Sequence, residues 1–362
     1  MTTRRISFPV MAALLLTGAV ACSGTPAKPA SGRLAGQTGP VPGPAAPQPS
    51  ATSVAGPPAA DGGPVSCSAP GRTVSTAAQL TAALASARPG TTITLAAGVY
   101  HGDFVASVSG TSTAPISLCG DRNATLDGPS TTSGYTFHLD HASWWRLVGF
   151  TVEGGQKGVM TDESSDDIIY GLYVHGIGDE GIHLRSFSSD DIVSHNVIRD
   201  TGLNVQFYGE GIYVGSAHEN WCLYTGCGPD ESNDDILIDN NIADTTAENI
   251  DIKEGTTGGT ITGNVLNGTG MVGSAATAWI NVKGNNWKIL DNVGTDSILD
   301  GYSVHQVYPG WGIGNTFIGN QAALTGTGVG IYVQSHHLQT VIACNNTVTG
   351  VPLSNLPCQS VN

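Results

Sequence analysis

The segment Asp235-Ile-Leu-Ile-Asp-Asn240 joins a β-branched run to a polar turn, and the chain repeats it as Gly259-Thr-Ile-Thr-Gly-Asn264 and Trp287-Lys-Ile-Leu-Asp-Asn292. From the copy that ends at Phe150 to the copy that ends at Asn345, the last positions lie 22, 24, 44, 24, 28, 28 and 25 residues apart. Short strands that recur every ~20–30 residues are typical of a parallel β-helix, in which each repeat forms one coil. The spacing of 44 marks one coil with a large insertion.

Asparagine occupies the turn of six copies, and a helix precedes the first of them. Stacked amide side chains can hydrogen-bond along a solenoid, so we predict a column of Asn196, Asn240, Asn264, Asn292, Asn320 and Asn345. In residues 75–88, one helical face carries Leu80, Ala83, Leu84 and Ala87. We expect this helix to cap the open end of the solenoid, where bare strand edges would aggregate.

The first 66 residues have a different composition from the repeats. Residues 1–22 combine Arg4 and Arg5 with a short apolar run and small residues, as in a secretory signal peptide. Their end, Ala19-Val-Ala-Cys22, resembles a bacterial lipobox and predicts lipidation of Cys22, although ordinary signal-peptidase cleavage fits the same residues. Residues 23–66 hold 10 of the 19 prolines and are expected to be a disordered linker. Residues 67–362 then form the β-helix domain of an exported protein, either a cell-surface lipoprotein or a secreted one.

Six cysteines follow Cys22, and an even number in an exported chain predicts disulfides. The predicted pairs are Cys67–Cys119, Cys222–Cys227 and Cys344–Cys358. The last two pairs are close in sequence, so they would staple a loop and the C-terminus, and the first would pin the start of the domain. No Cys-x-x-Cys spacing occurs, which argues against zinc.

The domain that begins at residue 67 is strongly acidic, with 10 Lys and Arg against 28 Asp and Glu, a formal charge of −18. Such a surface repels phosphate backbones and excludes a nucleic-acid partner. An anionic polysaccharide can bind only at a face where basic residues or a metal ion reverse the field. We expect a monomer whose only link to a membrane is the N-terminal lipid.

A second strand in each coil gathers the polar residues that could carry chemistry. With the isoleucines of these strands inward, alternation predicts two outward columns. The first consists of His183, Tyr213, Asp251, Asn281, His305 and Tyr332. The second consists of Arg185, Gly215, Lys253, Lys283, Val307 and Gln334.

Three glutamates enter successive strands of this set: Glu180, Glu210 and Glu248. Parallel strands lie ~4.8 Å apart, so these carboxylates would be stacked neighbours. Carboxylates that repel one another need a cation, and oxygen ligands of this kind suit Ca²⁺, with Asp251 as a fourth ligand. The alternative is that the glutamates are solvated turn residues balanced by the basic second column.

Lys253 is the strongest candidate for a catalytic group. Beside Lys283 and a divalent cation, its pKa would be lowered, which suits proton abstraction. Lys283, Arg185 or Tyr213 would then assist the leaving oxygen. The alternative for Lys253 is a salt bridge to a neighbouring carboxylate, Asp251 or Glu254.

Several further side chains are expected to contact a saccharide. Those that line the groove are His183, Asn281 and His305. Those that stack on sugar rings are Trp221 and Tyr224 in the inserted loop, with Tyr308 and Trp311 later in the chain. Packing of the loops against the coil explains the aromatic residues equally well.

The sequence resembles the pectate-lyase-like right-handed β-helices, especially Ca²⁺-dependent polysaccharide lyases of the chondroitinase B and alginate lyase kind. The resemblance rests on the segments 78–80, 89–95 and 98–100, similar to the family's capping helix and first coil, and on Glu248-Asn-Ile-Asp-Ile-Lys253. In the family, a metal-binding Glu precedes the catalytic Lys by five residues. Two positions depart from the pattern: Thr246 replaces a second metal-binding Glu, and Asn281-Val-Lys-Gly-Asn285 replaces an Arg-His-Gly-Asn.

The resemblance implies an all-β fold, a single-stranded right-handed parallel β-helix with an N-terminal capping helix. It also implies β-elimination on a uronate-containing polysaccharide, with Lys253 as base and Ca²⁺ as cofactor. Because the fold does not fix the function, two alternatives stay open. One is a glycoside hydrolase that uses Asp251 with Glu210 or Glu248, and the other is a non-catalytic glycan-binding or structural solenoid.

Overall fold

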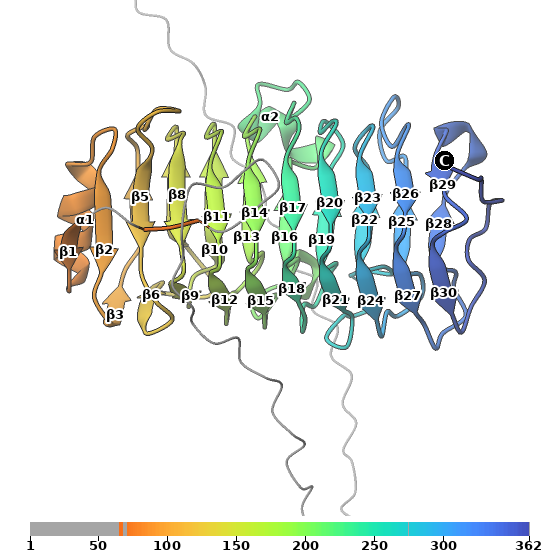
Figure 1. Cartoon of the computed structure of the whole chain (residues 1–362), viewed down its shortest axis with the longest axis horizontal. Helices are drawn as coiled ribbons and strands as arrows, with labels where there is room; N and C mark the ends of the chain where they lie inside the picture. The colour runs from red at the N-terminus through yellow and green to blue at the C-terminus, as the bar shows by residue number, and fades with distance from the viewer. Residues whose placement is uncertain (1–64, 68–70, 274, 362) are drawn as a thin grey trace, which may run out of the picture. The chain divides into compact units, whose positions relative to one another are not determined.

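The computed structural model describes residues 65–67, 71–273 and 275–361. Within these residues, the strands form three parallel sheets that wind into a β-helix (Figure 1), which confirms the predicted fold. Sheet A has 11 strands: β1 (Arg72–Val74), β2 (Thr92–Leu95), β5 (Ile116–Cys119), β8 (Trp145–Val148), β11 (Ile168–Tyr170), β14 (Ile192–Ser194), β17 (Ile236–Ile238), β20 (Thr260–Thr262), β23 (Lys288–Leu290), β26 (Thr316–Ile318) and β29 (Val341–Ile342).

The other two sheets alternate with sheet A around each coil. Sheet B has 10 strands: β3 (Gly98–His101), β6 (Ala124–Asp127), β9 (Thr151–Glu153), β12 (Tyr173–His175), β15 (Val197–Arg199), β18 (Asn241–Ile242), β21 (Val265–Asn267), β24 (Val293–Thr295), β27 (Gln321–Ala323) and β30 (Thr347–Thr349). Sheet C has nine strands: β4 (Phe104–Ala106), β7 (Tyr135–Asp140), β10 (Lys157–Asp162), β13 (Ile182–Arg185), β16 (Ile212–Val214), β19 (Ile250–Ile252), β22 (Ile280–Val282), β25 (Tyr302–Val304) and β28 (Ile331–Val333).

The core is the interior of the coil, because alternate residues of every strand point inward. In sheet A, Leu147, Ile169 and Val193 stack in register and are fully buried. Trp145, Trp279 and Trp287 are the largest fully buried side chains among the described residues. The coil therefore encloses a dry column of aliphatic and aromatic side chains.

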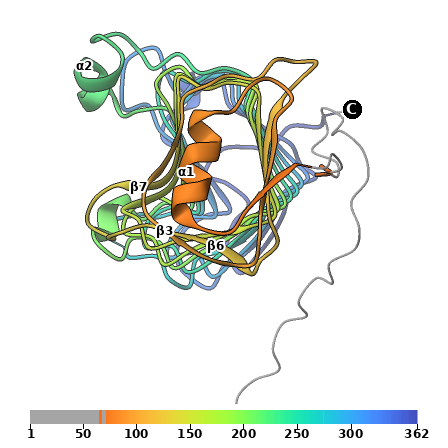
Figure 2. The ribbon, with the colours of Figure 1, turned by 90° about the vertical axis from the view of Figure 1, so that its left-hand side faces the viewer.

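The predicted capping helix is present as α1 (Ala77–Ala85), shorter than the expected span 75–88. Thr76 caps its N-terminus, where the Thr76 hydroxyl accepts a hydrogen bond from the Gln79 backbone N–H. The four residues expected on its apolar face are all buried. Figure 2 shows α1 lying across the end of the stacked coils, which confirms its role as a cap.

An asparagine ladder runs between sheets A and B. It consists of Asn196, Asn240, Asn264, Asn292, Asn320 and Asn346, and each Nδ2 donates to the Oδ1 of the next member at 2.9–3.0 Å. The last member corrects the predicted column, which ended at Asn345. Asn345 lies in the exposed turn beside the ladder, because Cys344 and Asn345 stand where the preceding coil has Gly319 alone. This one extra residue shifts the buried position from Asn345 to Asn346.

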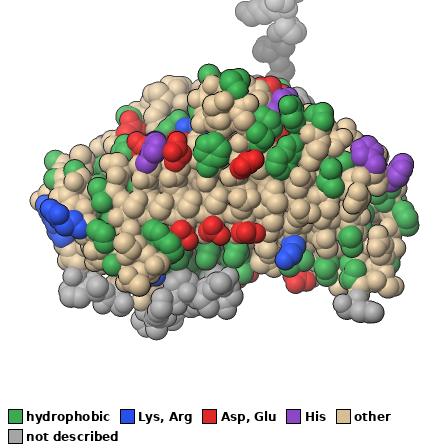
Figure 3. Space-filling model, turned by 90° about the horizontal axis from the view of Figure 1, so that it is seen from above, with side chains coloured by type: hydrophobic (Ala, Val, Ile, Leu, Met, Phe, Trp, Pro, Cys, Tyr) green, Lys and Arg blue, Asp and Glu red, His purple; other side chains and the backbone are tan. Residues whose placement is uncertain are grey.

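An aspartate ladder runs at the opposite ends of the sheet A strands, in the turns from sheet C. Asp167 Oδ1 accepts from Trp145 N, Asp191 Oδ1 from Asp167 N, and Asp235 Oδ1 from Asp191 N, at 2.6–3.0 Å. Burial raises the pKa of Asp235 to about 7. Beside the ladder, Asp166, Asp190 and Asp234 adopt positive φ values of 56–61°, and Figure 3 shows acidic side chains in a short row on this face.

All three predicted disulfides are present: Cys67–Cys119, Cys222–Cys227 and Cys344–Cys358. The predicted signal peptide, the lipidation site Cys22 and the linker up to residue 64 lie outside the described residues. Val65, assigned to the linker by the sequence, is buried against Cys119 and Val148, so ordered packing begins before Cys67. None of the helices in the described part of the chain is long and apolar enough to cross a membrane.

Candidate active site

One coil supplies both loops that border the middle of sheet C. Before β16, residues 200–211 contain η1 (Gln206–Tyr208), and after it, residues 215–235 contain η2 (His218–Asn220) and α2 (Trp221–Tyr224). Between the loops lies a cavity of about 280 Å³, bordered by Tyr208 from one loop and Tyr224 from the other. Figure 2 shows the α2 loop projecting beyond the stacked coils. This is the insertion expected from the 44-residue spacing.

The first outward column of sheet C has the predicted register from β13 to β22. His183 pairs with Tyr213, Tyr213 with Asp251, and Asp251 with Asn281. In the next strand, β25, the predicted register was wrong by two residues.

In β25, Tyr302 pairs with Ile280 and Ser303 with Asn281, so His305 follows Lys283 in the second column and Val307 leaves that column. The sequence suggested that Val304 takes the inward position that Ile280 has in the preceding strand. In the structure, the larger Tyr302 takes this position, and the alternation of residues alone does not distinguish the two.

The predicted carboxylates gather in part. Glu210, Glu248 and Asp251 are buried, and each places one oxygen within 4.8 Å of the others. Glu180 enters the adjacent strand, but its carboxylate is bonded to Lys157 and lies 3.6 Å from His183 Nδ1. The structure therefore assembles three of the four predicted metal ligands and pairs the fourth with a lysine.

These carboxylates differ in how their charge is balanced. Burial raises the pKa of Glu210 well above its usual value, and the nearby Glu180 and Glu248 raise it further. Burial opposes ionisation of Asp251 as well, but Lys253 at 2.6 Å and Lys283 at 2.5 Å lower its pKa. Glu248 accepts a hydrogen bond from Asn281 Nδ2 at 2.9 Å. Glu210 is thus the carboxylate with the least compensation.

The three carboxylates have the chemistry of a site for a divalent cation. Glu210 Oε2 is buried and has no hydrogen-bond partner among the described residues. An orphaned carboxylate oxygen beside two further carboxylates is a donor set that hard cations accept. Lys253 and Lys283 already balance the charge of Asp251. Glu210 and Glu248 are therefore the two ligands whose charge a bound cation would balance.

Lys253 lies at the centre of the site, and its ionisation corrects the prediction. Burial alone would lower the pKa of Lys253, but Asp251, Tyr213 and Glu210 together hold it well above the usual value. The ammonium Nζ lies 4.7 Å from the centre of the Tyr213 ring. The salt bridge to Asp251, left open as an alternative by the sequence, is therefore formed. Burial also raises the pKa of Tyr213 well above its usual value.

The two groove histidines are neutral bases rather than cations. Burial lowers the pKa of His183 well below its usual value, and Lys157 and Arg185 lower it further. His183 Nε2 lies 3.0 Å from the Gly215 carbonyl, which only accepts, so Nε2 carries the hydrogen and Nδ1 is unprotonated. Burial and Lys283 likewise lower the pKa of His305, whose Nδ1 is 2.9 Å from Asn281 Oδ1.

Arg185 supports the wall of the cavity. Its guanidinium makes two hydrogen bonds of 2.7 Å to Asp162, and its Cζ lies 4.0 Å from the centre of the Tyr224 ring. This fork is already occupied by a carboxylate, so the structure gives Arg185 a positioning role for Tyr224.

The aromatic residues divide into packed and open ones. Trp221 is 4% exposed, donates from Nε1 to the Ser216 carbonyl and packs 5.0 Å from the Tyr308 ring. It therefore holds the inserted loop against the coil and offers no face to a sugar, which corrects its predicted stacking role. Tyr308 and Tyr224 remain 40% and 39% exposed, and Trp311 is half-buried.

Lys157 is a site residue that the sequence reasoning missed. It begins β10, stands in register with Glu180, and lines the cavity with Tyr135 and Tyr208. The signal was present in Lys157-Gly-Val-Met160, whose Gly-Val pair aligns with Gly181-Ile182 in the next coil. Extending the alignment of the sheet C strands by one coil toward the N-terminus would have included Lys157.

Solved structures of polysaccharide lyases share this architecture. An alginate lyase from Paenibacillus sp. strain FPU-7 matches with a TM-score of 0.74 and 35% sequence identity, over 78% of this chain and 96% of that lyase. The pectate lyase Pel9A matches with a TM-score of 0.56 and 16% identity, over 77% of this chain and 75% of Pel9A, which shows the fold alone. No family model matches the chain, and no curated protein matches its sequence.

Proposed function

The chain belongs to the family of pectate-lyase-like right-handed β-helices that includes this alginate lyase, and we propose that it cleaves a uronate-containing polysaccharide by β-elimination. The observation that carries the proposal is the position of Lys253. It is held between the Asp251 carboxylate and the Tyr213 ring, and Tyr213 lines the cavity between the two loops.

β-Elimination needs one group that takes a proton from C5 and another that gives a proton to O4. The C5–H electron pair forms the C4=C5 double bond while the C4–O bond breaks. We assign C5 deprotonation to Lys253 and protonation of O4 to the Tyr213 phenol. Lys253 takes the C5 proton in its neutral form, after its ammonium has lost a proton to solvent. Because the Asp251 carboxylate 2.6 Å away favours the ammonium, we expect the rate to rise with pH.

The substrate carboxylate must be neutralised as negative charge develops beside it. Lys157, Lys253 and Lys283 are three of the 10 basic residues of a domain with a charge of −18. Lys157 begins β10, and Lys253 and Lys283 directly follow β19 and β22, so all three belong to the sheet C side of the coil. Such a local reversal of the field attracts an acidic polymer to this face. Asn281 stands in the same coil as Lys283, and His305 follows Lys283 in the next coil, where further sugar units would lie.

Glu210, Glu248 and Asp251 are the residues that would hold the expected Ca²⁺. When bound, the ion would withdraw charge from the substrate carboxylate and make the adjacent C–H more acidic. Without it, Lys157, Lys253 and Lys283 supply the nearest positive charge to the carboxylates of the site.

Export is part of the proposal, with a cell-surface lipoprotein anchored at Cys22 or a secreted protein as its two forms. Three disulfides fit an oxidising compartment outside the cytoplasm. We propose a monomer, since the helix α1 closes one end of the solenoid.

The test is incubation with alginate, pectate and glycosaminoglycans, with Ca²⁺ or EDTA, while the ultraviolet absorbance of unsaturated uronate is recorded. We expect product from one polymer class and a loss of about 10²–10⁴-fold in Lys253→Ala. Lys288→Ala, a change of an exposed lysine on sheet A, is the matched control.

Three other results would contradict the proposal or its assignment of the base. Reducing ends without unsaturated product would identify a hydrolase. Binding without turnover would identify a glycan-binding protein. Full activity in Lys253→Arg would mean that Lys253 acts through its charge and does not remove the proton, because arginine stays protonated.

A further inference from the structure

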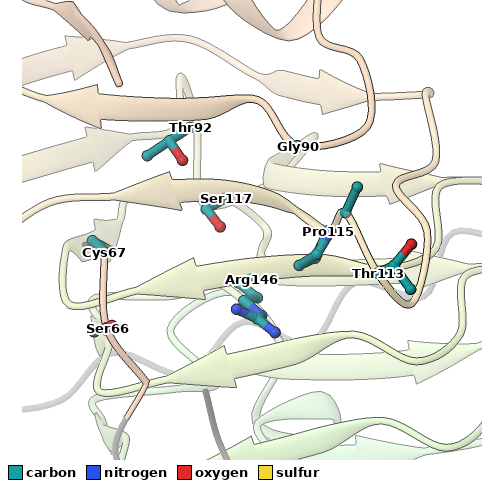
Figure 4. A pocket seen from close by; sticks show the side chains of 9 residues that line it. Ser66, Cys67, Gly90, Thr92, Thr113, Pro115, Ser117 and Arg146 are labelled. Carbon is teal, nitrogen blue, oxygen red and sulfur yellow. The ribbon is translucent and has the colours of Figure 1, made fainter. Parts of the chain in front are cut away.

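A second cavity lies on the outer face of sheet A, away from the residues of the active site. Its volume is about 270 Å³. Figure 4 shows Thr92, Ser117 and Arg146 in line across adjacent strands, with Thr113 and Pro115 on a loop at one side and Ser66 and Cys67 at the other. This cavity belongs to none of the machinery described above.

The strand register builds the cavity floor. Thr92 pairs with Ser117 and Ser117 with Arg146, so three polar side chains from β2, β5 and β8 stack along the axis. Their neighbours Ile93, Leu118 and Leu147 point inward and are fully buried, which fixes the outward direction of the polar residues. The disulfide Cys67–Cys119 holds one wall in place.

Arg146 places a half-buried positive charge on the cavity floor. No carboxylate among the described residues forms an ion pair with it, whereas Arg185 and Arg199 are paired with Asp162 and Asp244. Burial lowers the pKa of Arg146, and no neighbouring charge contributes to the shift. In a domain of charge −18, a half-buried guanidinium with no ion pair to a described carboxylate is available to bind an anion.

The lining defines the class of ligand. A guanidinium presents a planar fork that matches a carboxylate. The hydroxyls of Thr92 and Ser117 make no hydrogen bond to any described residue and can meet sugar hydroxyls. A volume just below the ~300–1,000 Å³ of usual ligand sites limits the occupant to about one sugar unit.

We propose that this cavity is an accessory site that holds one uronate unit, with its carboxylate on Arg146 and its hydroxyls on Thr92 and Ser117. The identity of the saccharide rests on the proposed function, but the site itself does not. A second contact on another face raises the effective concentration of a long polymer around the protein and adds nothing for a short oligomer.

The test uses the full chain with the Lys253→Ala change, which removes turnover, and saturated uronate trisaccharides as probes. Calorimetric titration is expected to find two sites, and the further change Arg146→Met to leave one, with about tenfold weaker retention in a gel that contains the polymer. Arg88→Met, on the exposed turn after α1, is the matched control and should change neither value.

In the catalytically intact protein, Arg146→Met should leave turnover of short oligomers unchanged. Equal stoichiometry with and without Arg146 would overturn the proposal, even if the protein proves to be a lyase. Sulfate that binds at Arg146 while trisaccharide does not would overturn it as well, because the site would then be a simple anion site. Arg146-dependent saccharide binding in a protein without lyase activity would support the accessory site and refute the proposed function.

Discussion

The asparagine ladder and the glutamates that enter sheet C both place one polar side chain per coil along the axis, yet they behave in opposite ways. Each ladder amide offers a donor and an acceptor, so Asn264 donates to Asn292 and accepts from Asn240. The glutamates offer acceptors alone. In the stack, Glu180 pairs with Lys157, whereas one oxygen of Glu210 has no hydrogen-bond partner in the part of the chain that the structure describes.

This difference separates structural repetition from functional repetition. A column that satisfies its own hydrogen bonds needs nothing from outside and can recur in every coil. A column of like charges is costly to bury, so it persists where lysines, a cation or a substrate compensate it. The same residue pattern in sequence therefore has two physical meanings, and single substitutions can tell them apart.

The largest effect is expected at Tyr213, on the functional side of the comparison. Tyr213→Phe removes the proposed proton donor and keeps the ring under Lys253, so kcat should fall by about 10²–10⁴-fold with unchanged folding. Initial rates of unsaturated uronate release measure the loss. Tyr332→Phe, in the same outward column at β28, should stay within threefold of wild type. Equal losses in both variants would show that the effect is not catalytic.

The next effect is on the structural side. Asn264→Ala leaves Asn240 N–H and Nδ2 without their acceptor and frees the Leu237 and Asn292 oxygens. Several buried groups lose partners at once, so the free energy of unfolding should fall by about 3 kcal/mol or more. Urea titration followed by circular dichroism measures it. Asn345→Ala, in the exposed turn, should cost below about 1 kcal/mol, and a similar cost at both positions would refute the ladder's role.

A smaller effect links the glutamates to their cation. Millimolar Ca²⁺ should raise the unfolding free energy by about 1–3 kcal/mol if it binds the folded state alone. Glu210→Gln keeps the shape of the side chain but removes the orphaned charge, so this gain should disappear. Differential scanning calorimetry with Ca²⁺ or EDTA measures both proteins. A Ca²⁺ response that survives in Glu210→Gln would place the ion elsewhere.

The smallest effect concerns the aspartate ladder, which lacks the donors of its asparagine counterpart. The pKa of Asp235 is about 7 in the fold against 3.8 for the free group, so its folded form prefers the proton. Stability from this group is complete below about pH 4 and is lost as the pH rises through about 7. Asp235→Asn should therefore stabilise the protein at about pH 8, where the aspartate must be buried as an anion, and should change its stability little at about pH 4.

Urea titration across this pH range measures the effect, with Asp239→Asn in an exposed turn as control. A gain that does not change with pH would mean that the carboxyl group of Asp235 does not titrate during unfolding in this window.

The fold was predictable because it repeats. β-Branched runs, polar turns and an amphipathic cap each report a local preference, and stacking adds them in register. Errors arose where one coil departs from the pattern: an extra residue moved the ladder from Asn345 to Asn346, and Tyr302 replaced an inward isoleucine, which shifted His305. A period alone cannot show which of two apolar residues enters the core.

The sequence predicted which residues form the candidate site, but not how the pKa values of these residues are shifted. Alternation placed Lys253 beside Asp251 and Tyr213 correctly, but the sign of the Lys253 pKa shift depends on how closely Asp251 approaches, which spacing does not give. Burial of Trp221 depends likewise on how the inserted loop folds back. Lys157 lay outside the columns because its strand contains no isoleucine to mark the inward side.

Both walls of the cavity come from residues 200–235, a single coil whose inserted loop carries its own disulfide, Cys222–Cys227. Asn196 and Asn240 flank this stretch and tie it to the neighbouring coils through the ladder. A recombination event that exchanges the stretch between them would replace the walls and leave the stacking contacts unchanged. Substrate range in such a protein can therefore evolve as a cassette, one coil at a time, without a new fold having to be found.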